Sequence, residues 1–264
     1  MQQSETPSLK GSHAAVTGGG SGIGAAAARE LARQGARVTL MGRSRKRLDA
    51  VAKAIAAAGG TAAVEPVDVT EPASVASAFA SAAARLGPLS ILVNNAGTAE
   101  SAPFARTGLD LLERMLRVNL TGAFLCTQAA LPAMLAARSG RIVSVASTAG
   151  LRGYAYVAAY CAAKHGLVGM TRALALEIAR SGVTANAVCP GYTETELMDR
   201  AVANIVAKTG RSADAARAEL AAVNPMGRFV KPEEVAATIA FLCSAAAASI
   251  TGEAIAVAGG EVTS

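Results

Sequence analysis

The sequence feature that most constrains the fold is a regular alternation of short apolar segments with longer amphipathic ones. The short segments have the length and composition of β-strands; they are HAAVT, ARVTLM, TAAVEPV, LSILV, GRIVSVA, VTANAV and EAIAVA. The longer segments show helical spacing of apolar residues and cover 22–34, 44–57, 72–86, 108–137 and 155–180. This order predicts an α/β fold, a doubly wound parallel sheet of about seven strands with helices on both faces.

Length and strand spacing indicate one domain with an insertion. At 264 residues the chain is near the upper size for one hydrophobic core, so we expect residues 1–264 to form a single domain. Residues 190–230 follow a late strand and show no strand pattern of their own. In an open α/β sheet, an insertion at this point lies over the carboxyl ends of the strands, so we expect a wall or lid on the substrate side.

Charge and composition argue against several classes of function. The formal net charge is +6, but aromatic residues make up only 3% of the chain, so side chains that stack on nucleic-acid bases are scarce. An anionic small-molecule ligand explains the charge as well. The cysteines form no CxxC pair and histidines are few, which argues against a metal site or a disulfide framework. These residues are Cys126, Cys161, Cys189, Cys243, His13 and His165.

The sequence shows no signal for a membrane or for export. Its longest apolar runs, such as SAAAASI, fall well short of the roughly 18 residues that a membrane-spanning helix needs. The polar N-terminal stretch MQQSETPSLKGSH has no apolar segment of the kind found in signal peptides. We therefore expect a soluble, cytoplasmic protein with neither a membrane nor nucleic acid as a partner.

A glycine-rich turn, TGGGSGIG, follows the first strand directly and opens an amphipathic helix. Missing side chains at such a turn let main-chain N–H groups and the helix N-terminus approach a pyrophosphate. A merely tight turn is the alternative, but the position between strand and helix is typical of a Rossmann-type dinucleotide site. The residues predicted to bind the cofactor here are Gly18, Ser21, Gly22, Ile23 and Gly24.

The end of the second strand indicates which dinucleotide binds. A dinucleotide domain usually places an acidic residue there, on the adenosine ribose, whereas this chain has Gly42 followed by Arg43. A guanidinium can bind the additional phosphate of NADPH, so the sequence favours NADPH, with NAD as the alternative. Arg43 also opens the run RSRKR, which at a helix start is commonly a solvated surface, and its side chain can instead lie over the adenine.

The stretch GYAYVAAYCAAKHG contains three tyrosines, of which Tyr160 alone has a cation four residues later, at Lys164. On a helix this spacing places both side chains on one face, one turn apart. An ordinary amphipathic helix produces the same pattern. The pair by itself is therefore only a candidate catalytic site.

Taken together, these motifs resemble the short-chain dehydrogenase/reductase family, and the resemblance extends from about residue 9 to 261. The matching elements occur in the family's order: TGGGSGIG at 17–24, DV at 68–69, NNAG at 94–97, VN at 118–119, Ser147, YCAAK at 160–164 and PGYTET at 190–195. Within the family, RIVSVASTAG and SGVTANAVCPGYTET are most similar to β-ketoacyl-thioester reductases and polyketide ketoreductases. A serine ahead of Tyr-x-x-x-Lys, preceded by NNAG and the glycine-rich turn, is highly specific as a set.

The resemblance implies a catalytic group of Asn119, Ser147, Tyr160 and Lys164. Reduction of a ketone leaves an alkoxide, so an acid must lie beside the carbonyl oxygen, and Tyr160 is that acid. We expect the Lys164 ammonium and an oxidised nicotinamide to lower the pKa of Tyr160 from its reference value near 10. Ser147 would hold the substrate oxygen, and Asn119 would hold a water that relays protons to the lysine.

The resemblance also implies further contacts to cofactor and substrate. Asp68 and Val69 would contact the adenine, and Lys164 and Tyr160 the nicotinamide ribose. The other cofactor residues implied are Asn95, Ala96, Gly97, Pro190, Gly191, Thr193 and Thr195. The substrate residues implied are Ser147, Ala149, Tyr154 and Tyr192.

The substrate implied is a ketone, reduced reversibly to a secondary alcohol, and a β-ketoacyl thioester on CoA or a carrier protein is the first interpretation. Leu176 stands where an acyl-carrier reductase commonly has arginine, although Arg138 matches the other basic position, so a CoA thioester or a free ketone stays open. The alternatives are a dehydrogenase of alicyclic or aromatic alcohols with NAD, or a non-catalytic redox sensor. The resemblance further implies a homotetramer in which helices 108–137 and 155–180 pack against their copies.

Overall fold

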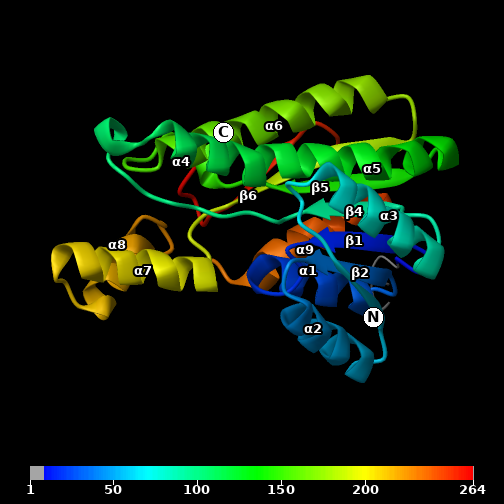
Figure 1. Cartoon of the computed structure of the whole chain (residues 1–264), viewed down its shortest axis with the longest axis horizontal. Coiled ribbons are helices and arrows are strands. Elements are labelled where there is room, and N and C mark those ends of the chain that lie inside the picture. The colour runs from blue at the N-terminus through cyan, green and yellow to red at the C-terminus, as the bar shows by residue number, and fades with distance from the viewer. Residues whose placement is uncertain (1–8, 264) are drawn as a thin grey trace, which may run out of the picture.

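The computed structural model of the chain describes residues 9–263, and its centre is one seven-stranded parallel sheet in the order β3-β2-β1-β4-β5-β6-β7 (Figure 1). The strands are β1 His13–Thr17, β2 Arg37–Gly42, β3 Thr61–Pro66, β4 Ile91–Asn94, β5 Gly140–Val145, β6 Val183–Pro190 and β7 Ala254–Val257. The predicted α/β fold, a single Rossmann-like domain, is confirmed. The strand order reverses between β1 and β4, which is where a doubly wound sheet opens a ligand crevice at its carboxyl edge.

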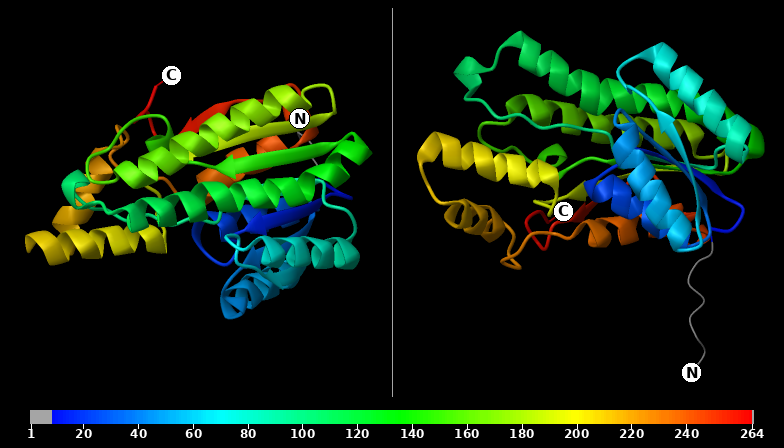
Figure 2. Two further views of the ribbon diagram at one scale, coloured as in Figure 1. Left: turned by 45° about the horizontal axis from the view of Figure 1, so that its top comes forward. Right: turned by 60° about the horizontal axis from the view of Figure 1, so that its bottom comes forward.

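Helices cover both faces of the sheet (Figures 1 and 2). The two largest clusters of buried apolar residues lie one on each face. On one face lie α1 (Gly22–Arg33), which packs against β1 and β2, α2 (Arg45–Ala57), which packs against β2 and β3, and α9 (Pro232–Cys243), which packs against β5, β6 and β7. The core on this face includes Leu31, Leu40 and Ile239. On the other face lie α3 (Pro72–Leu86), α5 (Gly122–Ala137) and α6 (Ala158–Ile178), packed through Phe79, Leu92 and others. Burial on both faces explains why the strands are almost wholly apolar.

The helix predicted at 108–137 is continuous but not regular. It consists of α4 (Leu109–Leu116), a π-helical turn at Arg117–Thr121 and α5. The short uninterrupted apolar runs of the sequence predict no membrane-spanning helix, yet Leu109–Ala137 is long and apolar enough to cross a membrane by length and composition alone. The scattered polar residues in this helix do not lower its mean hydropathy much. Its contacts with α3, α6, β4 and β5 show that here it is a covering helix of the sheet.

The helix predicted at 155–180 and the predicted insertion at 190–230 have the following structures. The helix predicted from residue 155 begins at Ala158, because Tyr156 has a φ of 68°, which interrupts helical geometry. The strand-free interval 190–230 contains α7 (Glu196–Thr209) and α8 (Ala213–Ala222), which project beyond the end of the sheet (Figure 1). A single parallel bridge between Thr193 and Val230 joins the two ends of this insertion.

Two further expectations concern the cysteines and the polar N-terminal stretch. All four cysteines of the chain are buried and free. Residues 1–8, on which most of the expectation about the polar N-terminal stretch rests, lie outside the described residues.

Candidate active site

A cavity of about 860 Å³ opens at the carboxyl edge of the sheet, between the glycine-rich turn, the ends of β4, β5 and β6, and helix α7. It brings together most of the residues predicted from sequence. Those that line it are Gly18, Ser21, Gly22, Ile23, Asn95, Ala96, Gly97, Asn119, Ser147, Ala149, Tyr154, Tyr160, Lys164, Pro190, Gly191, Tyr192, Thr193 and Thr195. The other four predicted residues, Gly24, Arg43, Asp68 and Val69, are not part of this lining in the described chain.

The glycine-rich turn has the shape that a dinucleotide phosphate needs. Gly18 has a φ of 64°, and a Cβ there would lie 2.8 Å from Asn95 Nδ2; a Cβ on Gly22 would lie 3.0 Å from the Thr195 methyl group. Within residues 9–263, the Ser21 side chain does not cap α1, so the first N–H groups of the helix stay available to a ligand. These residues therefore fit a pyrophosphate, whereas Gly24 packs against Gly18 and allows close contact of helix and strand.

The threonine that ends β1 fixes the neighbouring loop. Thr17 Oγ1 accepts hydrogen bonds from the main-chain N–H groups of Asn95 and Ala96, at 2.9 and 3.0 Å. Asn95 Nδ2 donates to the Thr17 carbonyl at 3.0 Å. Asn94, expected to be structural, donates to Thr127 Oγ1 of α5 at 2.9 Å. The loop after β4 is thus held against the glycine-rich turn, and together they form one wall of the cavity.

Arg43 and Asp68 lie near each other beyond the ends of β2 and β3. The pKa of Asp68 is lowered first by hydrogen bonds from Thr70, and the charge of Arg43 adds to the effect. Arg43 itself is exposed. Val69 is buried against Gly122 of α5, so it packs in the protein interior. The structure therefore places Arg43 and Asp68 together outside the cavity, at the expected adenosine end.

The catalytic candidates converge from β5 and α6. Lys164 is buried, its Nζ donates to the Val145 carbonyl at 2.9 Å, and it lies 5.6 Å from the centre of the Tyr160 ring. Ser147 Oγ accepts from the Ala149 N–H at 3.1 Å and is hydrogen-bonded to Tyr160. A Cβ on Gly150 would lie 2.8 Å from the Lys164 carbonyl, so this glycine allows the loop after β5 to approach α6 closely.

Asn119 occupies the π-helical turn between α4 and α5, a geometry that is frequent at functional sites. Its Nδ2 donates to the carbonyls of Thr98 and Met115 at 2.9 and 3.0 Å, and its Oδ1 accepts from the Thr98 N–H at 3.2 Å. A Cβ on Gly97 would lie 2.7 Å from Asn119 Oδ1 and 3.6 Å from Lys164 Nζ. The glycine therefore keeps the space between the amide and the ammonium open, which is where a relay water would fit.

The pKa values of the central pair are shifted by burial in the free protein. Burial raises the pKa of Tyr160 to about 12, although the hydrogen bond from Ser147 opposes this, and burial lowers the pKa of Lys164 to about 8. The lowering expected from Lys164 together with an oxidised nicotinamide concerns the cofactor-bound site and stays a prediction, whereas in the free protein burial raises the pKa of Tyr160. Lys164 is buried and Tyr160 is half-buried, and the partial loss of hydration penalises the phenolate and the ammonium alike.

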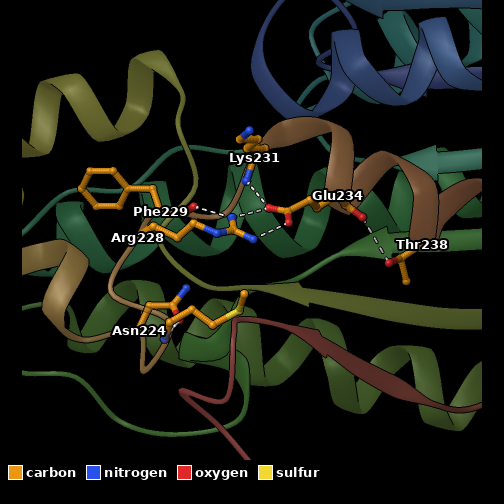
Figure 3. Close-up of polar contacts among 7 residues, drawn as sticks. Asn224, Arg228, Phe229, Lys231, Glu234 and Thr238 are labelled. Carbon is orange, nitrogen blue, oxygen red and sulfur yellow. Dashed lines mark hydrogen bonds and ion pairs between the residues drawn. The ribbon is translucent and has the colours of Figure 1, made fainter.

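The turn after α8 carries an ion pair that joins the insertion to α9. Arg228 donates from Nη1 and Nη2 to the two carboxylate oxygens of Glu234, at 2.8 and 2.6 Å, and the Lys231 main-chain N–H donates to the same carboxylate at 2.7 Å (Figure 3). These donors, Arg228 first, lower the pKa of Glu234 to about 2. Because Val230 pairs with Thr193 beside this turn, the ion pair anchors the insertion next to the cavity.

Sequence reasoning missed two contributions to the cavity. Asn204 of α7 donates to Ser101 Oγ at 3.1 Å and so links the insertion to the loop after β4. The Tyr154 hydroxyl donates to Glu261, from the segment after β7. Neither contact has a local sequence signal, because each joins residues about 100 positions apart and depends on the tertiary fold.

Comparison with known proteins agrees with this architecture. Residues 12–205 match the family model for short chain dehydrogenases. The chain is 40% identical to granaticin polyketide synthase putative ketoacyl reductase 1 of Streptomyces violaceoruber, over 94% of this chain and 92% of that protein. It is 45% identical to cis-4-hydroxycyclohexanecarboxylate dehydrogenase of Sinomonas cyclohexanicum, over 94% and 95%.

The fold also matches solved structures. A crystal structure of an actinorhodin polyketide ketoreductase variant with NADPH superposes with a TM-score of 0.92 at 39% identity, covering 95% of this chain and 97% of that one. A putative NAD(P)-dependent gluconate 5-dehydrogenase from Beutenbergia cavernae, with bound NADP, gives a TM-score of 0.87 at 41% identity and covers 97% and 99%. The chain belongs to the short-chain dehydrogenase family of oxidoreductases.

Proposed function

We propose that the protein reduces a ketone reversibly to a secondary alcohol with NADPH. The observation that carries this proposal is the meeting of Ser147, Tyr160 and a buried Lys164 in one cavity that also contains the glycine-rich turn. A bound nicotinamide cofactor would supply the hydride. A non-catalytic redox sensor would need only the glycine-rich turn, and the convergence of all three polar side chains argues against it.

Each residue then has a defined task. The Ser147 hydroxyl holds the carbonyl oxygen near the Tyr160 phenol, which donates its proton as the alkoxide forms. The Lys164 ammonium stabilises negative charge that develops on the phenol oxygen, and its position is set by the Val145 carbonyl. Asn119 stands beside the route by which the proton is replaced from solvent.

The choice of NADPH rests on Arg43, which is exposed beyond β2 and carries a charge where a ribose phosphate would lie. Arg43→Ser is expected to lower kcat/KM for NADPH about tenfold, the order of one charge-assisted contact. The value for NADH should change less than about twofold, because NADH lacks the phosphate. Arg45→Ser is a matched control in the same basic run, since Arg45 lies beside Asp49. Equal losses with both cofactors would contradict this role of Arg43.

We propose a β-ketoacyl thioester, on CoA in the first place, or a related ketone as the substrate. The polyketide ketoreductase relatives favour an acyl ketone, and the apolar side chains of α7 that line the cavity, Leu197, Met198 and Ile205, suit a chain or ring. Leu176, where a carrier-protein reductase would offer a cation, is 82% exposed and apolar. The second candidate is oxidation of an alicyclic alcohol with NAD, which the 45% identical hydroxycyclohexanecarboxylate dehydrogenase favours.

The test of the proposed function follows loss of NADPH absorbance with acetoacetyl-CoA and a panel of alicyclic and aromatic ketones. We expect turnover with at least one class of ketone. The class with the highest rate identifies the type of substrate. Oxidation of cyclohexanols with NAD, without reduction of the acyl ketones by NADPH, would favour the second candidate. Binding of NADPH without turnover on the whole panel, in both directions, would support the sensor.

We also propose a cytoplasmic homotetramer. Exposed apolar side chains lie along α5, among them Phe124 and Leu135. A second copy of the chain would cover these surfaces and bury the outer side of the apolar helix at 109–137.

A further inference from the structure

One wall of the cavity contains a tyrosine that is hydrogen-bonded to a buried carboxylate, and neither residue belongs to the catalytic group. Tyr154 lines the cavity, and its hydroxyl donates to Oε1 of Glu261, which is 8% exposed. The Arg152 guanidinium lies over the Tyr154 ring, 4.9 Å from its centre, and its Nη1 donates to the main-chain carbonyl of Glu261 at 3.2 Å. The segment after β7 is thereby attached to the substrate wall.

The structure makes room for this carboxylate. A Cβ on Gly191 would lie 2.6 Å from Glu261 Oε2, so a side chain at position 191 would displace the glutamate. Oε2 itself is buried and has no hydrogen-bond partner within residues 9–263. Tyr154 is therefore the side chain that satisfies this group, and an unpaired buried charge is costly.

In this arrangement the Tyr154 phenol proton is donated to Glu261. A tyrosine hydroxyl has one proton to donate, and rotating it toward a ligand would leave the Glu261 carboxylate without its side-chain donor. Thr148, next to Ser147, also hydrogen-bonds to the phenol. What Tyr154 offers to the cavity is consequently a hydrogen-bond acceptor, backed by a negative charge.

We propose that the Glu261–Tyr154 pair is a specificity determinant that selects ketones bearing a separate hydroxyl group and disfavours those bearing a carboxylate at the same position. A substrate hydroxyl can donate to the Tyr154 oxygen, whereas a carboxylate only accepts and meets the lone pair of that oxygen. The inference rests on the proposed ketone-reducing function, whose substrate class it narrows. Tyr154 touches the substrate, and Glu261 acts through it as a positioning residue.

The test measures binding separately from turnover. Calorimetry titrates 3-hydroxy-3-methylcyclohexanone and 4-hydroxy-4-methylcyclohexanone, and the corresponding methyl-substituted oxocyclohexanecarboxylates, onto the full chain saturated with NADP⁺. NADP⁺ cannot reduce the ketones, and their tertiary hydroxyl groups have no hydrogen that it could remove as hydride. We expect the wild type to bind the hydroxylated ketones more tightly, and Glu261→Gln, an isosteric change, to reduce that preference about tenfold. Tyr154→Phe should reduce it similarly, and adding Glu261→Gln to Tyr154→Phe should change it no further. Glu253→Gln, an exposed change in the same C-terminal part of the chain, is the control.

The outcomes separate the two proposals. A preference that survives Glu261→Gln and Tyr154→Phe, or a wild type that shows no preference or binds none of the four ketones, would overturn the specificity role. An equal effect of Glu261→Gln with and without the Tyr154 hydroxyl would also overturn it, because Glu261 would then act by another route. A preference lost as expected, in a protein that turns over no ketone with NADPH, would support the binding site while the proposed reduction fails.

Discussion

Replacing Tyr160 with phenylalanine is expected to lower kcat for ketone reduction by about 10²- to 10⁴-fold while NADPH still binds. The change removes only the phenol O–H, and the ring keeps its apolar neighbours Leu111, Met115 and Ala163. With a pKa of about 12, Tyr160 is protonated throughout the neutral range, so in the reduction direction it is ready to donate. Absorbance assays of turnover, beside fluorescence titration of NADPH, measure the two effects separately.

The matched control is Tyr156→Phe, a tyrosine in the same segment that also lines the cavity but is 67% exposed. We expect it to change kcat less than about threefold, since an exposed phenol hydroxyl remains hydrated and is poorly placed to transfer a proton. If Tyr160→Phe retained turnover, or if the two variants lost activity equally, Tyr160 would not be the acid. Loss of NADPH binding in Tyr160→Phe alone would instead point to a role in holding the cofactor.

The parts of the site that sequence could predict are those set by local backbone chemistry. The positive φ of Gly18 and Gly22 needs glycine; Gly18 directly follows a strand whose apolar pattern is clear, and Gly22 begins the next helix. The Tyr160 and Lys164 spacing requires only a regular helix, and the residues from Ala158 onward supply one. Parallel strands buried on both faces likewise follow from their continuous apolar runs.

Other parts depend on tertiary contacts and leave no such signal. The π-helical turn at Asn119 arises where its side chain bonds to Thr98, on a loop far from it in sequence. Tyr156 takes a left-handed conformation while its carbonyl accepts from the Ala102 N–H, so the helix starts late. The raised pKa of Tyr160 reflects burial, which spacing does not reveal. Glu261 reaches Tyr154 only because the chain folds back after β7.

Lys164→Met is expected to lower kcat/KM about 10²-fold or more, because it removes a buried ammonium that lies beside the reacting phenol and hydrogen-bonds the Val145 carbonyl. The pH dependence identifies this role. Burial lowers the pKa of Lys164 to about 8, so the wild-type reduction rate should fall as pH rises through about 8 and the ammonium loses its proton. In Lys164→Met that decline should disappear, whereas the exposed change Lys231→Met should leave the wild-type profile intact.

Stability distinguishes a catalytic from a structural lysine. The pKa of Lys164 is about 8 in the folded protein and 10.5 in the unfolded chain, so between these pH values the unfolded chain binds more protons. Burying the ammonium therefore lowers the free energy of unfolding below pH 8. This destabilisation decreases as the pH rises from about 8 to 10.5. Methionine fills similar space without the charge, so thermal unfolding of Lys164→Met at pH 7 should show an unchanged or higher Tm. A lower Tm would mean that the ammonium supports the fold, and the loss of activity would then say nothing specific about catalysis. High stability combined with lost turnover is what we expect of a charge kept in the interior for its chemistry.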